Sequence, residues 1–134
     1  MNDDCLFCKI VRGEIPNNTL YEDDETLVFL DIYPIARGHT LLTPKKHIVA
    51  MYELKRENMA FIMKLPEIVR KLKKVTGATG INIIQSNGKD AGQVIFHIHF
   101  HLIPRYPNDG VIKFPPRIEF DEELANDLMT RFAE

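Results

Sequence analysis

Polar and apolar residues alternate strictly between residues 96 and 102. Histidines occupy positions 97, 99 and 101, and every residue between them is apolar. Because successive side chains of a β-strand point to opposite faces, this spacing predicts a strand with three imidazoles on one face. The apolar row predicted for the other face consists of Phe96, Ile98, Phe100 and Leu102. One face could therefore pack on a core while the other carries out chemistry.

Shorter apolar segments bounded by turn residues predict further strands. They span residues 19–22, 26–32, 39–43 and 81–85. The acidic run between the first two suits a hairpin turn. Pro44 should stop the third strand, and Lys45 and Lys46 would follow it in a solvated loop.

Apolar residues at alternating steps of four and three predict one long amphipathic helix over residues 53–76. Its apolar stripe consists of Phe61, Leu65, Ile68, Leu72 and Val75. Pro66 lies within this stretch and should kink or divide the helix near Leu65. A short helical turn is expected at 6–11. A last helix is expected from about Asp121, with Leu124, Leu128 and Phe132 on one side.

Length and charge narrow the class of protein. The chain has 134 residues, a net charge of -2 and a pI near 6.2. This mixed charge argues against a nucleic-acid polymer or a membrane surface as partner. No apolar run approaches the length of a membrane span, and no signal-type apolar segment follows the acidic N-terminus. We therefore expect a single cytoplasmic domain over residues 1–134.

Cys5 and Cys8 form a C-x-x-C pair near the N-terminus. A reducing compartment disfavours a structural disulfide, which leaves a metal half-site, a redox pair or two buried thiols. The βαβ context of a thioredoxin-like redox site and a second C-x-x-C are both missing from the sequence. Histidines elsewhere in the chain are therefore the candidate partners of a metal site.

The three alternating histidines suit chemistry near neutral pH, since imidazole can act as nucleophile, metal ligand, base or phosphate partner. Asp31 ends an apolar run, where it could either cap a turn or bind a ligand. The polar segment 87–93 contains Gly88 and Gly92 and leads directly into the histidines. It could be a plain hairpin loop or a backbone nest for an anion.

These motifs together resemble the histidine triad (HIT) superfamily, which is named for three histidines alternating with apolar residues. The resemblance runs from residue 5 to about 105 and places the chain in the Hint-like nucleotide-binding branch, within its zinc-binding subset. It covers Cys5 to Ile10, the strand end at Asp31, Gly38 to Leu41, Pro44 to His47, the loop 87–93 and the histidines. Residues 106–134 would be a C-terminal extension of this HIT domain.

The resemblance implies an α+β fold, in which an antiparallel sheet of about five strands packs against one long helix, with short terminal helices. It also implies a homodimer with a continuous sheet. Members of this superfamily bind nucleotides and cleave or transfer nucleotidyl groups at the α-phosphate. A purine nucleotide is the substrate class that we expect.

Matching the motifs residue by residue implies particular roles. His99 would be the nucleophile that forms a covalent nucleotidyl intermediate, while His101 and His39 would stabilise charge on the phosphate. Asn87 and Gln93 would bind the phosphate or leaving group. The nucleoside slot would be formed by Leu6, Phe7, Ile10, Phe29, Asp31 and Ile32.

Zinc is the cofactor that the resemblance implies, and no magnesium requirement is expected. Cys5, Cys8, His47 and His97 would form a closed Cys2His2 structural site. The alternative is one catalytic metal held by all three alternating histidines, which would leave the cysteines unexplained.

Three functions follow as hypotheses. The first is hydrolysis of a nucleoside 5'-phosphoramidate or a related nucleotidyl substrate. The alternatives are a diadenosine polyphosphate hydrolase or nucleotidyltransferase, and a weakly active nucleotide-binding scaffold. Val94 departs from the family pattern, in which Ser or Thr often supplies a hydroxyl, so the preference for a leaving group could differ here.

Overall fold

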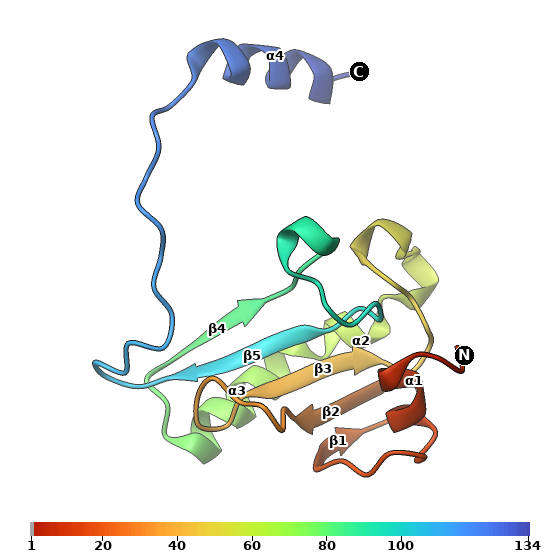
Figure 1. Ribbon diagram of the computed structural model, residues 1–134. Helices are drawn as coiled ribbons and strands as arrows, with labels where there is room; N and C mark the ends of the chain where they lie inside the picture. The colour runs from red at the N-terminus through yellow and green to blue at the C-terminus, as the bar shows by residue number, and fades with distance from the viewer. Residues whose placement is uncertain (1) are drawn as a thin grey trace.

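A computed structural model describes residues 2–134 and shows five antiparallel strands in one sheet (Figure 1). The order across the sheet is β1-β2-β3-β5-β4, so β1 and β4 are its edges. The strands are β1 Thr19–Glu22, β2 Thr26–Leu30, β3 Thr40–Pro44, β4 Gly80–Ile84 and β5 Phe100–Arg105. The α+β fold with a five-stranded sheet is therefore confirmed.

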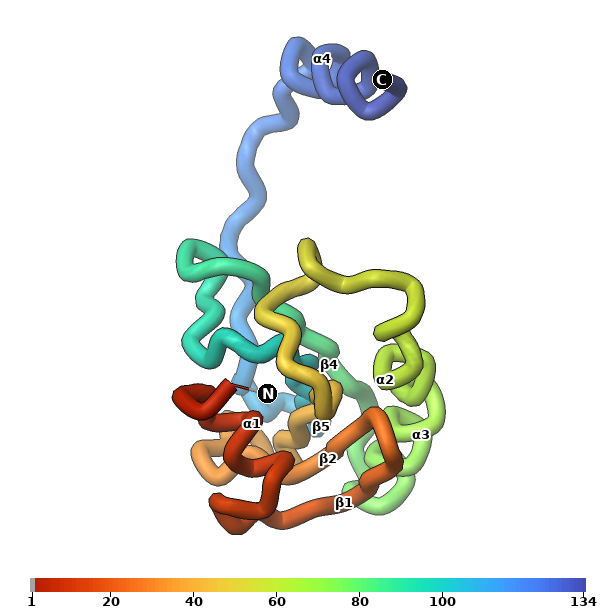
Figure 2. Tube along the Cα trace, turned by 90° about the vertical axis from the view of Figure 1, so that its right-hand side faces the viewer, coloured from red at the N-terminus to blue at the C-terminus, as the bar shows by residue number. Residues whose placement is uncertain are grey.

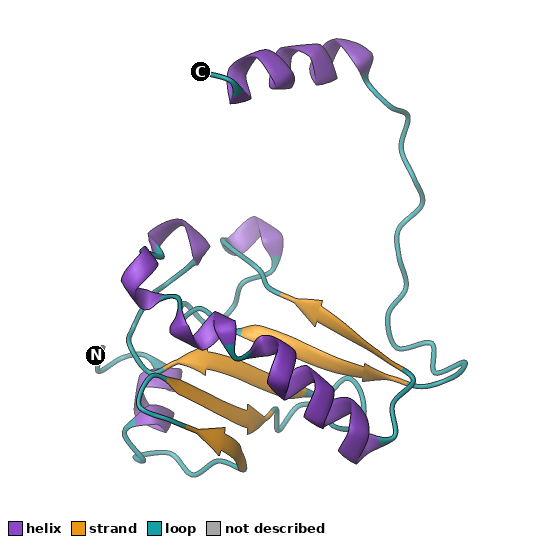
Figure 3. Cartoon of the chain, turned by 180° about the vertical axis from the view of Figure 1, so that it is seen from behind, coloured by secondary structure: helices purple, strands orange, loops and turns teal. Residues whose placement is uncertain are grey.

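Helices lie on both faces of this sheet. The longest, α3, packs on one face, and the short α1 lies on the other near β1 and β2 (Figures 1 and 3). The α-helices are α1 Leu6–Val11, α2 Ala60–Met63, α3 Leu65–Thr76 and α4 Glu122–Phe132. Three 3-10 helices are η1 Met51–Glu53, η2 Arg56–Asn58 and η3 Lys89–Ala91.

Alternation along the strands builds a separate core on each face. On the face of α3, Val28, Leu42 and Phe100 pack with Phe61, Ile68 and Leu72. On the face of α1, the neighbouring strand residues Leu27, Phe29 and Leu41 pack with Phe7 and Ile10. The second core is small and stops at the polar residues of β5, so it forms the base of a pocket.

The long helix expected over residues 53–76 is present only in its second half. Two 3-10 turns and the short α2 replace its first half, and α3 begins at Leu65. Pro66 occupies the first turn of α3, where its missing N–H needs no partner. The predicted division near Leu65 is thus confirmed. The placement of Val75 in the apolar stripe was wrong, because its side chain is 72% exposed.

The strand expected to carry all three histidines begins later than predicted, at Phe100. The β3–β5 pairing ends with Leu42 opposite Phe100. Pro44 has no N–H to continue the ladder. Instead, the Thr43 hydroxyl donates to the Ile98 carbonyl at 2.7 Å. Phe96 is 49% exposed and does not join the apolar row, whereas Ile98, Phe100 and Leu102 are buried as expected.

Gly38 positions the loop that precedes β3. Its φ is +82°, which favours glycine, and a Cβ atom there would lie 2.9 Å from Cγ2 of Thr76. The loop can therefore pass close to the end of α3 and deliver His39 to the sheet.

The chain beyond β5 leaves the sheet. Residues 106–121 contain no helix or strand, and they carry α4 well away from the other elements (Figure 2). Within residues 2–134 no helix is both long and apolar enough to cross a membrane.

Candidate active site

A pocket of about 490 Å³ opens on the face of the sheet that carries α1. Its walls are mostly apolar, and His99 and His101 are among the residues that line it. A largely apolar cavity with a few convergent polar groups is typical of a small-molecule site. The pocket is therefore the candidate active site.

All six residues expected to hold a nucleoside border this pocket. They are Leu6, Phe7, Ile10, Phe29, Asp31 and Ile32. The Phe7 ring meets His99 edge to face, with ring centroids 4.9 Å apart. An apolar ring and a catalytic candidate thus lie side by side in the pocket wall, so a bound base and a bound phosphate could both be accommodated.

Asp31 combines the two roles that the sequence left open. Its Oδ1 accepts a hydrogen bond from the Tyr33 N–H at 2.8 Å, which makes a tight turn after β2. Its Oδ2 lies 3.6 Å from Nε2 of His39, and the residue also lines the pocket. The turn therefore fixes a carboxylate at the pocket wall.

The His99 ring is oriented by the backbone. Its Nδ1 lies 2.7 Å from the carbonyl oxygen of His97, so Nδ1 carries the proton and donates it. In the neutral ring the lone pair is then on Nε2. That nitrogen is the one available for nucleophilic attack.

His39 and His101 form a second oriented pair. The Ile35 N–H donates to Nδ1 of His39 at 3.2 Å, so the proton of the neutral His39 ring is on Nε2. That Nε2 lies 2.9 Å from Nδ1 of His101 and donates to it. The proton of His101 is then on its own Nε2, which leaves a hydrogen-bond donor for a ligand.

Burial keeps these rings neutral. It lowers the pKa of His39 and of His99, and it lowers the pKa of His101 to about 4, where neighbouring His99 and His39 add to the effect. At pH 7 the rings therefore act through the tautomers described above.

Asn87 and Gln93, the candidates for binding the phosphate or leaving group, lie in the loop beside the pocket. Among the described residues that line the pocket, neither is present, although Gly92 and Val94 are. The buried Gln93 amide donates to the Val49 carbonyl at 2.7 Å and accepts from the Gly88 N–H at 2.8 Å. Asn87 Oδ1 accepts from the Met51 N–H at 2.7 Å. Both amides therefore hold the loop in place.

A second polar cluster lies beside the pocket and consists of Cys5, Cys8, His47 and His97. Their donor atoms all lie within 4.8 Å of one another. Nδ1 of His97 is 3.4 Å from Sγ of Cys5, and Nδ1 of His47 is 3.3 Å from Sγ of Cys8. A tetrahedral zinc ion with ordinary bond lengths separates sulfur and nitrogen ligands by about 3.5 Å.

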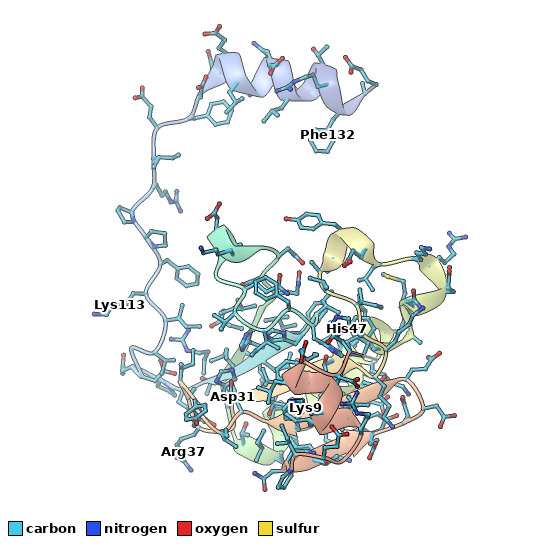
Figure 4. The ribbon with its side chains drawn as sticks, turned by 45° about the vertical axis from the view of Figure 1, so that its right-hand side comes forward. Lys9, Asp31, Arg37, His47, Lys113 and Phe132 are labelled. Atoms are coloured by element: carbon cyan, nitrogen blue, oxygen red, sulfur yellow. The ribbon has the colours of Figure 1, made fainter. Side chains whose placement is uncertain are left out.

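The surroundings of this cluster also suit a metal. Nε2 of the fully buried His97 donates to the Pro44 carbonyl at 2.7 Å, so its Nδ1 lone pair faces the cysteines. Burial raises the pKa of the Cys5 thiol, and the Cys8 N–H, which donates to Sγ of Cys5 at 3.3 Å, partly opposes this effect. The donor set and its spacing therefore fit a Cys2His2 metal site. Figure 4 labels His47 of this cluster and Asp31 of the pocket.

Some residues of the site were not predicted from the sequence. Tyr33 and Ile95 line the pocket, and the Ile35 N–H fixes the tautomer of His39. Tyr33 directly follows Ile32, which was assigned to the nucleoside slot, so its position beside the pocket could have been inferred. The role of a backbone N–H has no signal in the sequence.

Comparison with known proteins identifies the family. The HIT domain model matches residues 12–108. A HIT-like protein of Methanocaldococcus jannaschii is 47% identical over 124 residues, which are 90% of this chain and 95% of that protein. The chain belongs to the HIT family.

Two relatives are enzymes by name. An adenosine 5'-monophosphoramidase of Schizosaccharomyces pombe is 46% identical over 78% of this chain and 76% of its own length. An adenylylsulfatase of Arabidopsis thaliana is 44% identical over 81% of this chain and 56% of its own length.

Crystal structures of two bacterial proteins match almost the whole chain. A Streptococcus mutans protein superposes with a TM-score of 0.90 at 40% identity, covering 98% of this chain and 87% of its own. A HIT-family protein of Bacillus subtilis gives a TM-score of 0.90 at 35% identity, covering 98% and 96%.

Proposed function

We propose that the protein hydrolyses a purine nucleoside 5'-phosphoramidate, or a related nucleotidyl substrate, at the α-phosphate through a covalent intermediate on His99. The observation that carries this proposal is the bond between His99 Nδ1 and the His97 carbonyl, which leaves Nε2 as the nucleophile. The names of the two enzyme relatives support a hydrolase that acts on adenylyl compounds.

The reaction would proceed in two displacements. In the first, Nε2 of His99 attacks the α-phosphorus and the bond to the leaving amine breaks, while the amine takes a proton from solvent. In the second, water attacks the same phosphorus, the bond to His99 breaks, and a nucleoside monophosphate leaves with release of a proton. His101 Nε2–H would donate to a phosphate oxygen as charge develops.

The pocket divides the substrate between its two ends. The base would contact the apolar wall near Phe7 and Phe29, and Asp31 would accept hydrogen bonds from the ribose hydroxyls. Asn87 and Gln93 would act indirectly, by holding the loop whose residues Gly92 and Val94 border the pocket.

Trapping the intermediate tests this mechanism. The full-length protein is mixed with excess adenosine phosphoramidate and quenched in acid-free denaturant within milliseconds, and its intact mass is then measured. We expect an adduct of one adenylyl group on wild type, mapped to His99 by peptide fragmentation, and none on His99→Ala. Turnover by wild type with no adduct, even when the quench time is varied, would contradict the covalent step.

A substrate comparison separates the alternatives. Steady-state rates are measured with adenosine phosphoramidate, adenosine phosphosulfate and a diadenosine polyphosphate. A diadenosine polyphosphate hydrolase or nucleotidyltransferase would prefer the last substrate, and a scaffold protein would bind nucleotide without turning over any of them.

We also propose that Cys5, Cys8, His47 and His97 hold one structural zinc ion. When bound, zinc would tie the N-terminal segment to the chain that precedes β5. Metal analysis of protein purified without chelator should give about one zinc per chain, and a metal-free preparation that unfolds at the same temperature as untreated protein would refute this assignment.

A further inference from the structure

Asn17 is a polar residue of the pocket that the proposed chemistry does not use. It is half-buried and lies among the residues that line the cavity. Among residues 2–134, the other polar side chains of the lining are those of Asp31, Tyr33, His99 and His101. Polar groups in a mostly apolar pocket fix the orientation of a ligand. Since the histidines and Asp31 are assigned to the phosphate and the ribose, and Tyr33 is 82% exposed, Asn17 is the candidate contact for the base.

The pocket crosses the sheet along one line of paired residues. Thr19 of β1 lies opposite Phe29 of β2. Phe29 in turn lies opposite Leu41 of β3, and Leu41 lies opposite His101 of β5. The last three of these residues line the pocket. Neighbouring strands lie about 4.8 Å apart, so the three spacings from β1 to β5 amount to about 14 Å. The candidate site therefore extends from the histidines toward the β1 edge of the sheet.

Asn17 lies at the far end of this line. It precedes β1 by two residues, and the carbonyl of neighbouring Asn18 accepts a hydrogen bond from the Leu30 N–H at 3.0 Å. This bond holds the segment beside the end of β2, where Asp31 follows. A nucleotide with its α-phosphate at His101 and its ribose at Asp31 would direct its base toward Asn17. Once the side chains at both ends are allowed for, the width of the three strand spacings matches the span from the α-phosphate to the outer edge of a purine.

The amide of Asn17 has a fixed orientation. The Thr19 hydroxyl donates to Asn17 Oδ1 at 2.5 Å, and Thr19 itself is held in β1 by its pairing with Phe29. This bond determines which side of the amide carries the oxygen. Nδ2 remains as a donor, and Oδ1 keeps a second lone pair as an acceptor. A ligand at this end of the pocket therefore meets a donor and an acceptor in a set order.

This order of groups discriminates between the two common purines. We propose that Asn17 selects adenine over guanine as the base of the substrate, an inference that rests on the proposed nucleotide site. Adenine presents its 6-amino donor beside a ring-nitrogen acceptor on both its N1 edge and its N7 edge, which is the pattern that an Asn amide binds through two hydrogen bonds. Guanine presents two acceptors on its N7 edge, and on its N1 edge the donor and the acceptor are exchanged. An amide of fixed orientation that pairs with adenine therefore cannot pair with guanine in the same pose.

Binding measurements test this selectivity without requiring turnover. Dissociation constants of the full chain are measured by calorimetry for AMP, GMP and purine riboside 5'-monophosphate, which lacks the 6-amino group. Loss of a two-bond contact to the base should weaken binding of GMP and of the riboside by about tenfold relative to AMP. Asn17→Ala should remove this preference, mainly by weakening the binding of AMP.

Asn18→Ala is the matched control. Asn18 is the same residue type and the next in the chain, but it is exposed and is not among the described residues that line the pocket. This variant should keep the wild-type ratio of the AMP and GMP dissociation constants. Each ratio compares two ligands on one protein, so a change in stability alone does not alter it.

Two kinds of failure can be told apart. Equal affinity of wild type for AMP and GMP, or a preference for AMP that Asn17→Ala leaves unchanged, would overturn the role of Asn17 while the nucleotide site stands. Binding of none of the three nucleotides would overturn the proposed function together with this inference.

Thr19→Val tests the orientation of the amide. Valine has the shape of threonine and suits β1, but it cannot donate to Asn17 Oδ1. The freed amide could rotate and pair with either purine, so the preference for AMP should fall by about threefold, as expected for loss of one hydrogen bond. A preference that this variant leaves unchanged would overturn the fixed orientation as the cause of selectivity.

Discussion

The five histidines divide into two neighbouring clusters that use their nitrogens in opposite ways. In the cluster with Cys5 and Cys8, Nδ1 of His97 faces the sulfurs and its Nε2 donates to the Pro44 carbonyl, so both ring nitrogens are occupied. In the pocket, one nitrogen of His99 is occupied by the His97 carbonyl and the other is left free. The first arrangement is closed and suits a structural role, whereas the second is open and suits chemistry.

His97 connects the two clusters. Its ring lies among the proposed metal ligands, and its carbonyl sets the tautomer of His99. The closed cluster can therefore stabilise the open one without touching a substrate. If the cluster with Cys5 and Cys8 is structural and the pocket is catalytic, substitutions in the first should mainly lower stability. Substitutions in the second should mainly lower the reaction rate.

The largest effect is expected from His99→Ala. Removing the nucleophile should lower kcat by about 10⁴-fold or more, since the groups of a covalent mechanism act as a unit. Zinc content and the midpoint of thermal unfolding should stay at wild-type values. They are measured by elemental analysis and calorimetry beside the steady-state rate. A variant that retains a tenth of the wild-type rate would remove His99 from the role of nucleophile.

His47→Ala should show the converse pattern. Loss of a ligand to a metal present at 1,000 times its dissociation constant lowers the free energy of unfolding by about 4 kcal/mol. Chemical denaturation with and without added zinc measures this loss. At low temperature the folded variant should still bind AMP with nearly wild-type affinity, because His47 is not among the residues lining the pocket. Equal stability of variant and wild type would show that the closed cluster does not hold a metal.

His39→Ala tests the tautomer chain within the open cluster. Without the Nε2–H donor of His39, His101 can place its proton on either nitrogen, and the donor to the phosphate is lost part of the time. We expect kcat to fall about 10²-fold to 10³-fold, as for loss of one preorganised donor. His39→Gln, whose amide can still donate, should recover part of the rate. If both variants react at the wild-type rate, the pair has no catalytic role.

Much of this division could be predicted from the sequence, because it depends on residue type and on local spacing. The alternation predicted an apolar row opposite the imidazoles, and Ile98, Phe100 and Leu102 are buried as that pattern requires. The resemblance to the HIT superfamily, and not the C-x-x-C motif alone, named His47 and His97 as partners of the cysteines, and the four residues lie together. All six apolar and acidic positions assigned to the nucleoside slot line the pocket. Residue type and the spacing of apolar residues are sufficient to predict the position of a side chain where its segment can pack on the sheet in only one way.

The errors arose where a distant segment decides the local conformation. Residues 51–58 have helix-forming side chains, but the Met51 N–H bonds to Asn87 and the Tyr52 hydroxyl to the Asn87 carbonyl. These contacts favour 3-10 turns over a continuous helix. The late start of β5 depends on which residue lies beside Pro44, and the sequence does not specify that register. The same holds for the Ile35 N–H that orients His39.

A smaller and more graded effect is expected from pH. Burial lowers the pKa of His101 to about 4 and also lowers that of His39, both from an ordinary value near 6.5. Neutral His101 accepts the bond from His39, so the pair should stay intact as the pH falls through 6.5 and break only near 4. Burial also lowers the pKa of the proposed nucleophile His99, so the acidic limb of kcat/KM should have its midpoint below pH 6.5. The measured rate is corrected for acid hydrolysis of the substrate. An acidic limb of the pH profile with a midpoint at 6.5 or above would show that the histidines of the pocket are more solvated than their burial indicates.

Val94→Ser should have the smallest effect. Val94 borders the pocket and is 80% exposed, at the position where the resemblance to the HIT superfamily implies a hydroxyl. A new hydrogen bond to the phosphate or leaving group contributes about 0.5–1.5 kcal/mol, which corresponds to a rate increase of roughly twofold to tenfold. Val94→Ala removes the same bulk without adding a hydroxyl, so it separates the hydrogen bond from a change in pocket shape. A higher rate for Val94→Ser than for Val94→Ala and wild type, above all with poor leaving groups, would mean that the number of hydrogen-bond donors around the phosphate limits the reaction rate. Equal rates for all three would mean that the oriented histidines alone supply the donors that the reaction needs.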